Sequence, residues 1–158
     1  MAEIEHKLEV LNKIGKRLNK AGITWAIGAS LLLYFKEITD RFNDIDILVK
    51  EEDLLALKEI FMSMGTLKPQ SRSKKYKTRS FLEFTVEGVD VDVMSGFVIV
   101  DDGIEYDCSL QENQIVEYLM IKGVEIPLQS VSLWRKYYER MHRYSSVDMI
   151  DKFNMKSK

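Results

Sequence analysis

A short apolar segment that runs directly into small residues, with two alternating aspartates a short way beyond, constrains the fold of this chain most. Residues 23–27 read as a buried strand and are followed at once by Gly28-Ala29-Ser30. After thirteen intervening residues comes Asp44-Ile45-Asp46-Ile47, at the start of a second strand expected over residues 45–49. A strand, a tight turn, a short helix and a strand in this order predict an α/β domain.

The two aspartates are placed to work together. Successive side chains of a strand point to opposite faces, so Asp44 and Asp46 lie on one face with backbones about 7 Å apart. Carboxylate oxygens are the ligands that Mg²⁺ prefers. A pair of such ions can hold the attacking and leaving oxygens of a phosphoryl displacement. The pattern therefore predicts a magnesium site, with a third carboxylate expected from a neighbouring strand.

A β-hairpin further along the chain supplies candidates for that third carboxylate. Residues 81–86 and 89–94 alternate in polarity around the turn Glu87-Gly88, as hairpin strands do. Asp90 and Asp92 share one face of the second strand. We favour Asp92, which lies nearer the carboxyl end of the strand, and keep Asp90 as its substitute. The alternative is that both aspartates lie on a solvated hairpin face.

The small-residue turn is suited to binding the phosphate groups of a nucleotide. Glycine and alanine let a triphosphate approach the backbone closely, and amide groups at a helix start favour negative charge. The hydroxyl of Ser30 can add a hydrogen bond to a phosphate oxygen. Gly28, Ala29 and Ser30 are therefore candidate nucleotide-binding residues.

These motifs together resemble the nucleotidyltransferase superfamily with the DNA polymerase β-like fold. Its pattern is a hydrophobic residue, Gly, a small residue, Ser, about a dozen residues and then Asp-x-Asp/Glu. Ile27 through Ser30, Asp44 and Asp46 match it position by position, and the third family carboxylate maps to Asp92. The chain is most similar in layout to small stand-alone members such as the aminoglycoside and lincosamide nucleotidyltransferases.

The resemblance implies a function and a set of partners. It implies Mg²⁺-dependent (or Mn²⁺-dependent) transfer of a nucleoside monophosphate from an NTP such as ATP to a hydroxyl acceptor, with release of pyrophosphate. Asp44 and Asp46 would bind both metals, while Asp92 would bind the ion beside the acceptor and take its proton. Lys136 and Arg140 resemble a basic helix segment of the family and are further candidates for nucleotide binding. The acceptor and the preferred base stay open.

The rest of the chain predicts one nucleotidyltransferase domain over residues 1–158, with a mixed sheet flanked by helices. Its core is expected at 23–94 and a C-terminal helical segment at about 130–154. Apolar spacing predicts helices over 3–20, 31–36 and 53–64, then from Ser130 to about 143 and from 146 onward. Further strands are expected near 97–100, 104–108, 115–121 and 124–127. Trp134, Tyr137 and Tyr138 are expected to pack in the core, although either tyrosine could stack on a nucleobase.

Composition narrows the class of protein. The net charge of −2 argues against a strongly basic nucleic-acid binder. Cys108 is the single cysteine and cannot form an internal disulfide, as is usual in a reducing cytoplasm. No apolar run approaches the ~18 residues of a membrane span, and the charged N-terminus does not resemble a signal peptide. We expect a cytoplasmic protein with no membrane partner.

One segment is strongly basic, unlike the rest of the chain. Residues 68–79 carry six basic side chains and no acidic one. They predict a solvated loop, but Arg72, Lys74, Lys75, Lys77 or Arg79 could also reach the triphosphate or a nucleic acid, a partner that we do not favour.

One alternative function and one possibility of assembly stay open. The chain could be a catalytically silent binding module, such as a toxin–antitoxin or regulatory component. It could also form a homodimer, because a small domain with an open cleft can need a second subunit to complete its acceptor site.

Overall fold

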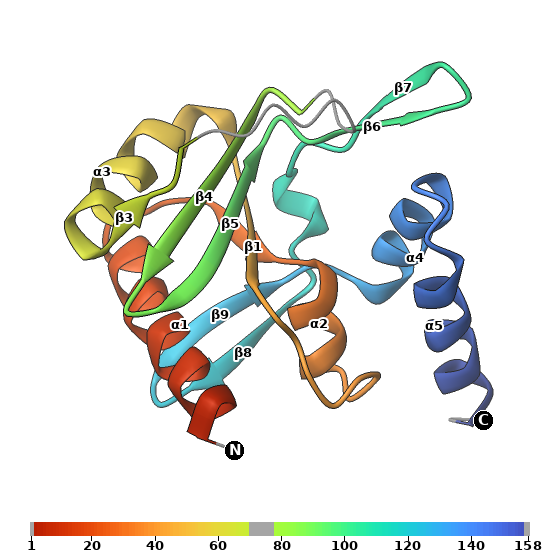
Figure 1. The fold of residues 1–158 in the computed structure, drawn as a ribbon, viewed down its shortest axis with the longest axis horizontal. Helices are drawn as coiled ribbons and strands as arrows, with labels where there is room; N and C mark the ends of the chain where they lie inside the picture. The colour runs from red at the N-terminus through yellow and green to blue at the C-terminus, as the bar shows by residue number, and fades with distance from the viewer. Residues whose placement is uncertain (1, 70–77, 157–158) are drawn as a thin grey trace.

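The computed structural model describes residues 2–69 and 78–156, which form a mixed sheet flanked by helices (Figure 1). Seven strands pair in the order β3-β4-β5-β2-β1-β9-β8. A separate two-stranded hairpin, β6-β7, projects from one end. The predicted α/β fold with C-terminal helices is confirmed.

A glycine turn joins the first helix to the first strand. α1 (Ala2–Lys20) ends where Gly22 adopts a φ of 71°, a conformation that glycine adopts without strain. The amide of Ile23 then donates to the carbonyl of Leu18 over 3.1 Å, which closes the helix end. Because Ile23 serves this cap, β1 covers only Trp25–Ile27 and is shorter than the predicted strand over 23–27.

The central strands come from distant parts of the sequence. β2 (Ile45–Val49) is antiparallel to β1 and parallel to β5 (Val89–Ser95). β5 forms the predicted hairpin with β4 (Ser80–Val86), and β3 (Thr66–Leu67) adds an edge. β9 (Val124–Leu128) joins β1 in parallel and pairs with β8 (Glu117–Ile121), which is the other edge.

Helices and short segments complete the molecule. α2 (Ala29–Phe35) follows β1, while the 3-10 turn η1 (Glu51–Asp53) leads into α3 (Leu54–Met64). β6 (Val98–Asp101) and β7 (Ile104–Asp107) form the projecting hairpin, and η2 (Glu112–Gln114) precedes β8. α4 (Val131–Arg140) and α5 (Tyr144–Lys156) end the described chain.

The start of α4 is as predicted and its end is not. The hydroxyl of Ser130 accepts a hydrogen bond from the amide of Leu133 at 3.1 Å, the usual role of a helix N-cap. The helix stops at Arg140 rather than near residue 143, and His142 adopts a φ of 60° in the turn to α5. The turn leaves Arg143 outside both helices.

The core is a continuous apolar cluster around the sheet. The inward side chains of β1, β2 and β5 pack against apolar faces of α1, α2 and α3, and Trp25, Phe61 and Phe84 are among the largest fully buried side chains. Among the described residues, no helix combines the length and apolarity needed to cross a bilayer.

Candidate active site

Three aspartates meet where β2 and β5 lie side by side. In the parallel pairing of these strands Asp46 is directly opposite Asp92. Asp44 comes immediately before β2, and all three aspartates line the same pocket. Neighbouring strands are about 4.8 Å apart, so the register alone brings these carboxyl groups together.

Burial and crowding favour the protonated form of all three carboxyl groups. Burial, and secondarily the charges of Asp92 and Asp44, raise the pKa of Asp46 well above its usual value. Burial and the charge of Asp44 raise the pKa of Asp92 to about 7. The pKa of Asp44 is raised by burial and then by Asp90. When all three groups are ionised, the site would carry more negative charge than its surroundings compensate.

The structure separates Asp90 from Asp92. Asp90 is exposed and forms an ion pair with Lys68, whose Nζ lies 2.7 Å from its Oδ1. It does not line the pocket that holds Asp44, Asp46 and Asp92. Asp92 is therefore placed at the candidate site, while Asp90 is a surface neighbour whose charge acts on Asp44.

The small-residue turn is tied to the same place by its backbone. The amide of Gly28 donates to the carbonyl of Asp46 at 3.3 Å. Ala29 has a φ of 55°, a strained conformation for a residue with a side chain and one that is common at functional sites. Ala29 and Ser30 line the carboxylate pocket. Gly28 does not line it, and its close neighbour is the indole of Trp134.

Trp134 makes glycine necessary at position 28. A Cβ at this position would lie 2.4 Å from the indole ring, much closer than van der Waals contact allows. The indole Nε1 donates to Oε1 of the buried Gln129 at 2.8 Å, which fixes the plane of the ring. Trp134 also lines the carboxylate pocket, so one side chain both packs the turn and forms a wall of the site.

The pocket has one acidic end and a largely apolar remainder. Its volume is about 430 Å³, a size typical of small-molecule sites. Beyond the residues already named, Arg143 and Ser146 line it, together with Asn43, Phe81, Met94, Phe97, Tyr138 and Met141. Tyr138 is buried close to Asp46, since the Asp46 charge adds to burial in raising the pKa of its hydroxyl.

Lys136 and Arg140 are not brought to this pocket. They line a separate hollow with Asp101 and Glu139, and the Arg140 guanidinium lies 3.6 Å from the centre of the Tyr106 ring. The basic residue at the site is Arg143, whose charge lowers the pKa of Asp46. Sequence reasoning missed it because it took residue 143 for the last turn of a helix, and no local signal marks the turn at His142.

Among the described residues of the basic segment, Lys68 acts on the carboxyl groups of the site. The charge of Lys68 lowers the pKa values of Asp44 and Asp92. Arg79 forms an ion pair with Glu51 on η1 and does not line the pocket. Arg72, Lys74, Lys75 and Lys77 lie outside the described residues.

The carboxyl groups of Asp44, Asp46 and Asp92 are the type of ligand that a hard cation binds, but their present arrangement is not that of a metal site. No group of three or more His, Cys, Asp or Glu side chains within residues 2–69 and 78–156 is arranged to hold a metal ion as it stands. All three carboxyl groups line one pocket, and after burial the charges of Asp92 and Asp44 raise the pKa of Asp46. A bound cation would relieve this crowding, because carboxylate oxygens are ligands that hard cations prefer.

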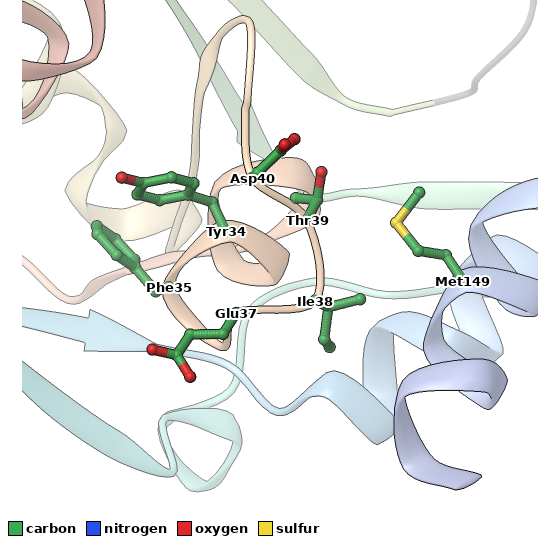
Figure 2. Close-up of a pocket in the computed structure, with 7 residues that line it drawn as sticks. All are labelled: Tyr34, Phe35, Glu37, Ile38, Thr39, Asp40 and Met149. Carbon is green, nitrogen blue, oxygen red and sulfur yellow. The ribbon is translucent and has the colours of Figure 1, made fainter. Parts of the chain in front are cut away.

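The structure also has a second, larger hollow. It has a volume of about 920 Å³ and lies between the segment that follows α2 and the helix α5 (Figure 2). Tyr34 and Phe35 come from α2, and Met149 of α5 stands across from Ile38 and Thr39. It shares no lining residue with the carboxylate pocket.

The raised carboxyl pKa values predict an unusual pH dependence of stability without metal. A carboxyl group whose pKa is higher in the folded than in the unfolded chain stabilises the fold at low pH, and this stability is lost as the pH rises through the folded value. For Asp92 the loss falls between about pH 4 and pH 7 and is complete above it. With a chelator present, we expect a lower urea midpoint at pH 8 than at pH 5. In Asp92→Asn this difference should shrink, and an unchanged difference would contradict the pKa assignment.

Comparison with known proteins identifies the fold. No protein-family model and no curated protein sequence matches the chain. A Thermotoga maritima protein proposed to be a nucleotidyltransferase superposes with a TM-score of 0.74 at 24% identity, over 96% of this chain and 94% of that chain. ANT(2")-Ia, solved in complex with adenylyl-2"-tobramycin, gives 0.61 at 13% identity over 91% and 87%. The lincosamide antibiotic adenylyltransferase LnuA, solved with lincomycin bound, gives 0.56 at 13% identity over 79% and 81%. The chain has the nucleotidyltransferase fold.

Proposed function

We propose that this protein is a Mg²⁺-dependent nucleotidyltransferase that moves a nucleoside monophosphate from an NTP to a hydroxyl acceptor and releases pyrophosphate. The observation that carries the proposal is the register of β2 and β5, which places Asp46 opposite Asp92 with Asp44 beside them. Such crowding of carboxylates is unfavourable in itself. It is expected where a site is built for cations and phosphates.

Several residues of the pocket have a role in the proposed reaction. Asp44, Asp46 and Asp92 hold the metal, and Mn²⁺ can replace Mg²⁺ on the same oxygens. A bound magnesium ion neutralises phosphate charge and lowers the pKa of the acceptor hydroxyl. Ser30, at the strained turn, offers its hydroxyl to the β- and γ-phosphates. Phe97 and Trp134 form apolar walls that exclude water and contact the base or the acceptor.

Arg143 supplies the positive charge for the triphosphate. It lines the pocket and acts electrostatically on Asp46. Arginine binds phosphate through paired, charge-assisted hydrogen bonds.

Arg143→Ala should therefore weaken binding of Mg·NTP about tenfold, the size expected for losing one hydrogen bond between charged groups. The measurement is isothermal titration calorimetry with each nucleotide. Arg140→Ala and Lys136→Ala are the matched controls, because these cations line a different hollow, and both should bind as the wild type does. A loss in the controls with none in Arg143→Ala would reverse this assignment.

The direct test is release of pyrophosphate. The assay uses Mg²⁺, each of the four NTPs and a panel of hydroxyl-bearing acceptors. It starts with ATP and with aminoglycosides and lincosamides, because ANT(2")-Ia and LnuA were solved with adenylyl-tobramycin and lincomycin. We expect acceptor-dependent release that stops when a chelator is added. If Mg²⁺ does not promote nucleotide binding and no acceptor supports release, the chain is a silent binding module.

A further inference from the structure

The strand β8 leaves one edge of the seven-stranded sheet open. It pairs with β9 on one side and is the last strand in the order, as Figure 1 shows. Alternate side chains along this edge are apolar and unusually exposed: Val116 by 55%, Tyr118 by 58% and Met120 by 59%. Three such residues in alternation form one apolar strip. Exposure of such a strip to water is unfavourable, and exposed apolar patches often mark interaction sites.

The backbone of the same residues faces the open edge. β8 and β9 are joined by the turn Lys122-Gly123, whose φ values of 48° and 83° are those of a two-residue hairpin turn. The residues flanking such a turn, Ile121 and Val124, form a hydrogen-bonded pair. Because bonded and non-bonded pairs alternate in an antiparallel ladder, Tyr118 and Met120 direct their N–H and C=O groups away from β9.

Protection against edge pairing is weak along this strand. Proteins protect their edges with very short strands, proline, bulges or charged residues. β3, the opposite edge, has only two residues. β8 has five, with no proline, and its one charged residue is Glu117 at the start, which forms an ion pair with Lys36. The segment from Tyr118 to Ile121 carries neither a charge nor a proline.

We propose that β8 pairs with β8 of a second copy of this chain, antiparallel about a two-fold axis at Leu119. In this register Tyr118 lies opposite Met120 of the partner subunit, and Met120 lies opposite Tyr118 of the partner subunit. Both are the residues whose backbone groups face outward, so each pair exchanges two N–H···O=C bonds. Two sheets of seven strands become one continuous sheet.

The strand is complementary to itself in charge. Glu117 stands at its start and Lys122 immediately after its end, so antiparallel pairing brings the acidic end of each copy to the basic end of the other. No like charges are opposed, since Glu117 faces Ile121 and Lys122 faces Val116. The opposed apolar pair joins an aromatic ring to a thioether, a favourable contact. This self-complementarity favours a second copy over an unrelated strand.

The proposed interface is independent of the carboxylate pocket. β1 and β9 separate β8 from β2 in the sheet, and no residue of β8 lines the pocket. Dimer formation and nucleotide binding can therefore fail separately.

Charge variants test the register. In Tyr118→Lys/Met120→Lys like charges face each other across the two-fold axis, whereas in Tyr118→Glu/Met120→Lys opposite charges do. Sedimentation equilibrium at about 1–100 µM, the range of modest affinities, should show a dimer for the wild type and for the Glu/Lys variant. The Lys/Lys variant should be a folded monomer by circular dichroism and should still bind Mg·NTP. Leu55→Lys/Met155→Lys, which alters apolar residues exposed by 76% and 75% elsewhere, should remain dimeric.

Disulfide cross-linking tests the position of the two-fold axis. Leu119 lies opposite Leu119 of the partner subunit, in a pair without backbone hydrogen bonds whose Cα atoms are about 4.5 Å apart. A disulfide can span this separation. Leu119→Cys in a Cys108→Ser background should form a covalent dimer under mild oxidation, and Ile104→Cys in the same background should not. A wild type that stays monomeric at about 100 µM overturns the proposal. So does a dimer that survives the Lys/Lys change, or one that both charge variants disrupt equally.

Discussion

Asp46→Asn should abolish nucleotidyl transfer, with a loss of at least about 10³-fold. Asp46 is partly buried and lies opposite Asp92 in the sheet. Asparagine keeps the shape but loses the charge that holds the cation, and metal ions supply several kcal/mol of transition-state stabilisation. The measurement is the rate of pyrophosphate release at saturating Mg·NTP and acceptor.

The same substitution should make the metal-free protein more stable. Burial and two neighbouring carboxylates oppose ionisation of Asp46, and a neutral amide removes that unfavourable charge. We expect the free energy of unfolding at pH 8 in a chelator to rise by about 0.5–2 kcal/mol, the range of single stabilising substitutions. Opposite changes in activity and stability would mark Asp46 as a functional residue rather than a structural one.

Asp90→Asn is the matched control for both measurements. Asp90 lies on the same strand face as Asp92, but it is exposed and paired with Lys68. Its replacement should leave most of the activity in place and change stability little, as expected for an exposed ion pair. Near-normal turnover by a folded Asp46→Asn protein, or equal losses in the two variants, would contradict the assignment.

Gly28→Ala should damage both the fold and the nucleotide site. The backbone of Gly28 is extended, with φ −133° and ψ −166°, so alanine suffers no conformational strain there. Its Cβ would instead lie 2.4 Å from the Trp134 indole. Overpacking of this kind costs about 1–3 kcal/mol. We expect a lower urea midpoint and weaker Mg·NTP binding, because displacement of either group moves the turn or the pocket wall.

A double variant isolates the contact with Trp134. The double variant Gly28→Ala/Trp134→Leu should recover part of the loss in Gly28→Ala, because residues in contact show non-additive effects. Strictly additive effects would show that the indole does not require glycine at position 28.

The fold and the carboxylate cluster could be predicted because their signals are local. β2 spans Ile45–Val49 as predicted, since branched apolar residues and alternation define a strand without further context. The hairpin strands are also close to their predicted bounds. The choice of Asp92 over Asp90 as the residue placed in the pocket depended only on their order along one strand and on that strand lying beside β2.

Other parts of the site depend on contacts between distant segments. Nothing near Gly28 indicates that residue 134 will lie against it, because β9 must first pair with β1 to bring α4 there. The placement of Arg143, in place of Lys136 and Arg140, depends on where α4 ends. His142 has no sequence feature that marks a helix end, yet its φ of 60° turns the chain. Long-range packing, rather than local propensity, decides these positions.

Calorimetric titration of nucleotide tests the central claim most directly. ATP, GTP, CTP and UTP are each titrated into the wild type with Mg²⁺ and with a chelator, and then into Asp44→Asn/Asp46→Asn. The proposal predicts binding that requires Mg²⁺, prefers one base and disappears in the double variant while its circular dichroism spectrum is unchanged. Binding that is the same with and without Mg²⁺, or that survives loss of both carboxylates, would contradict a metal-dependent nucleotidyltransferase site.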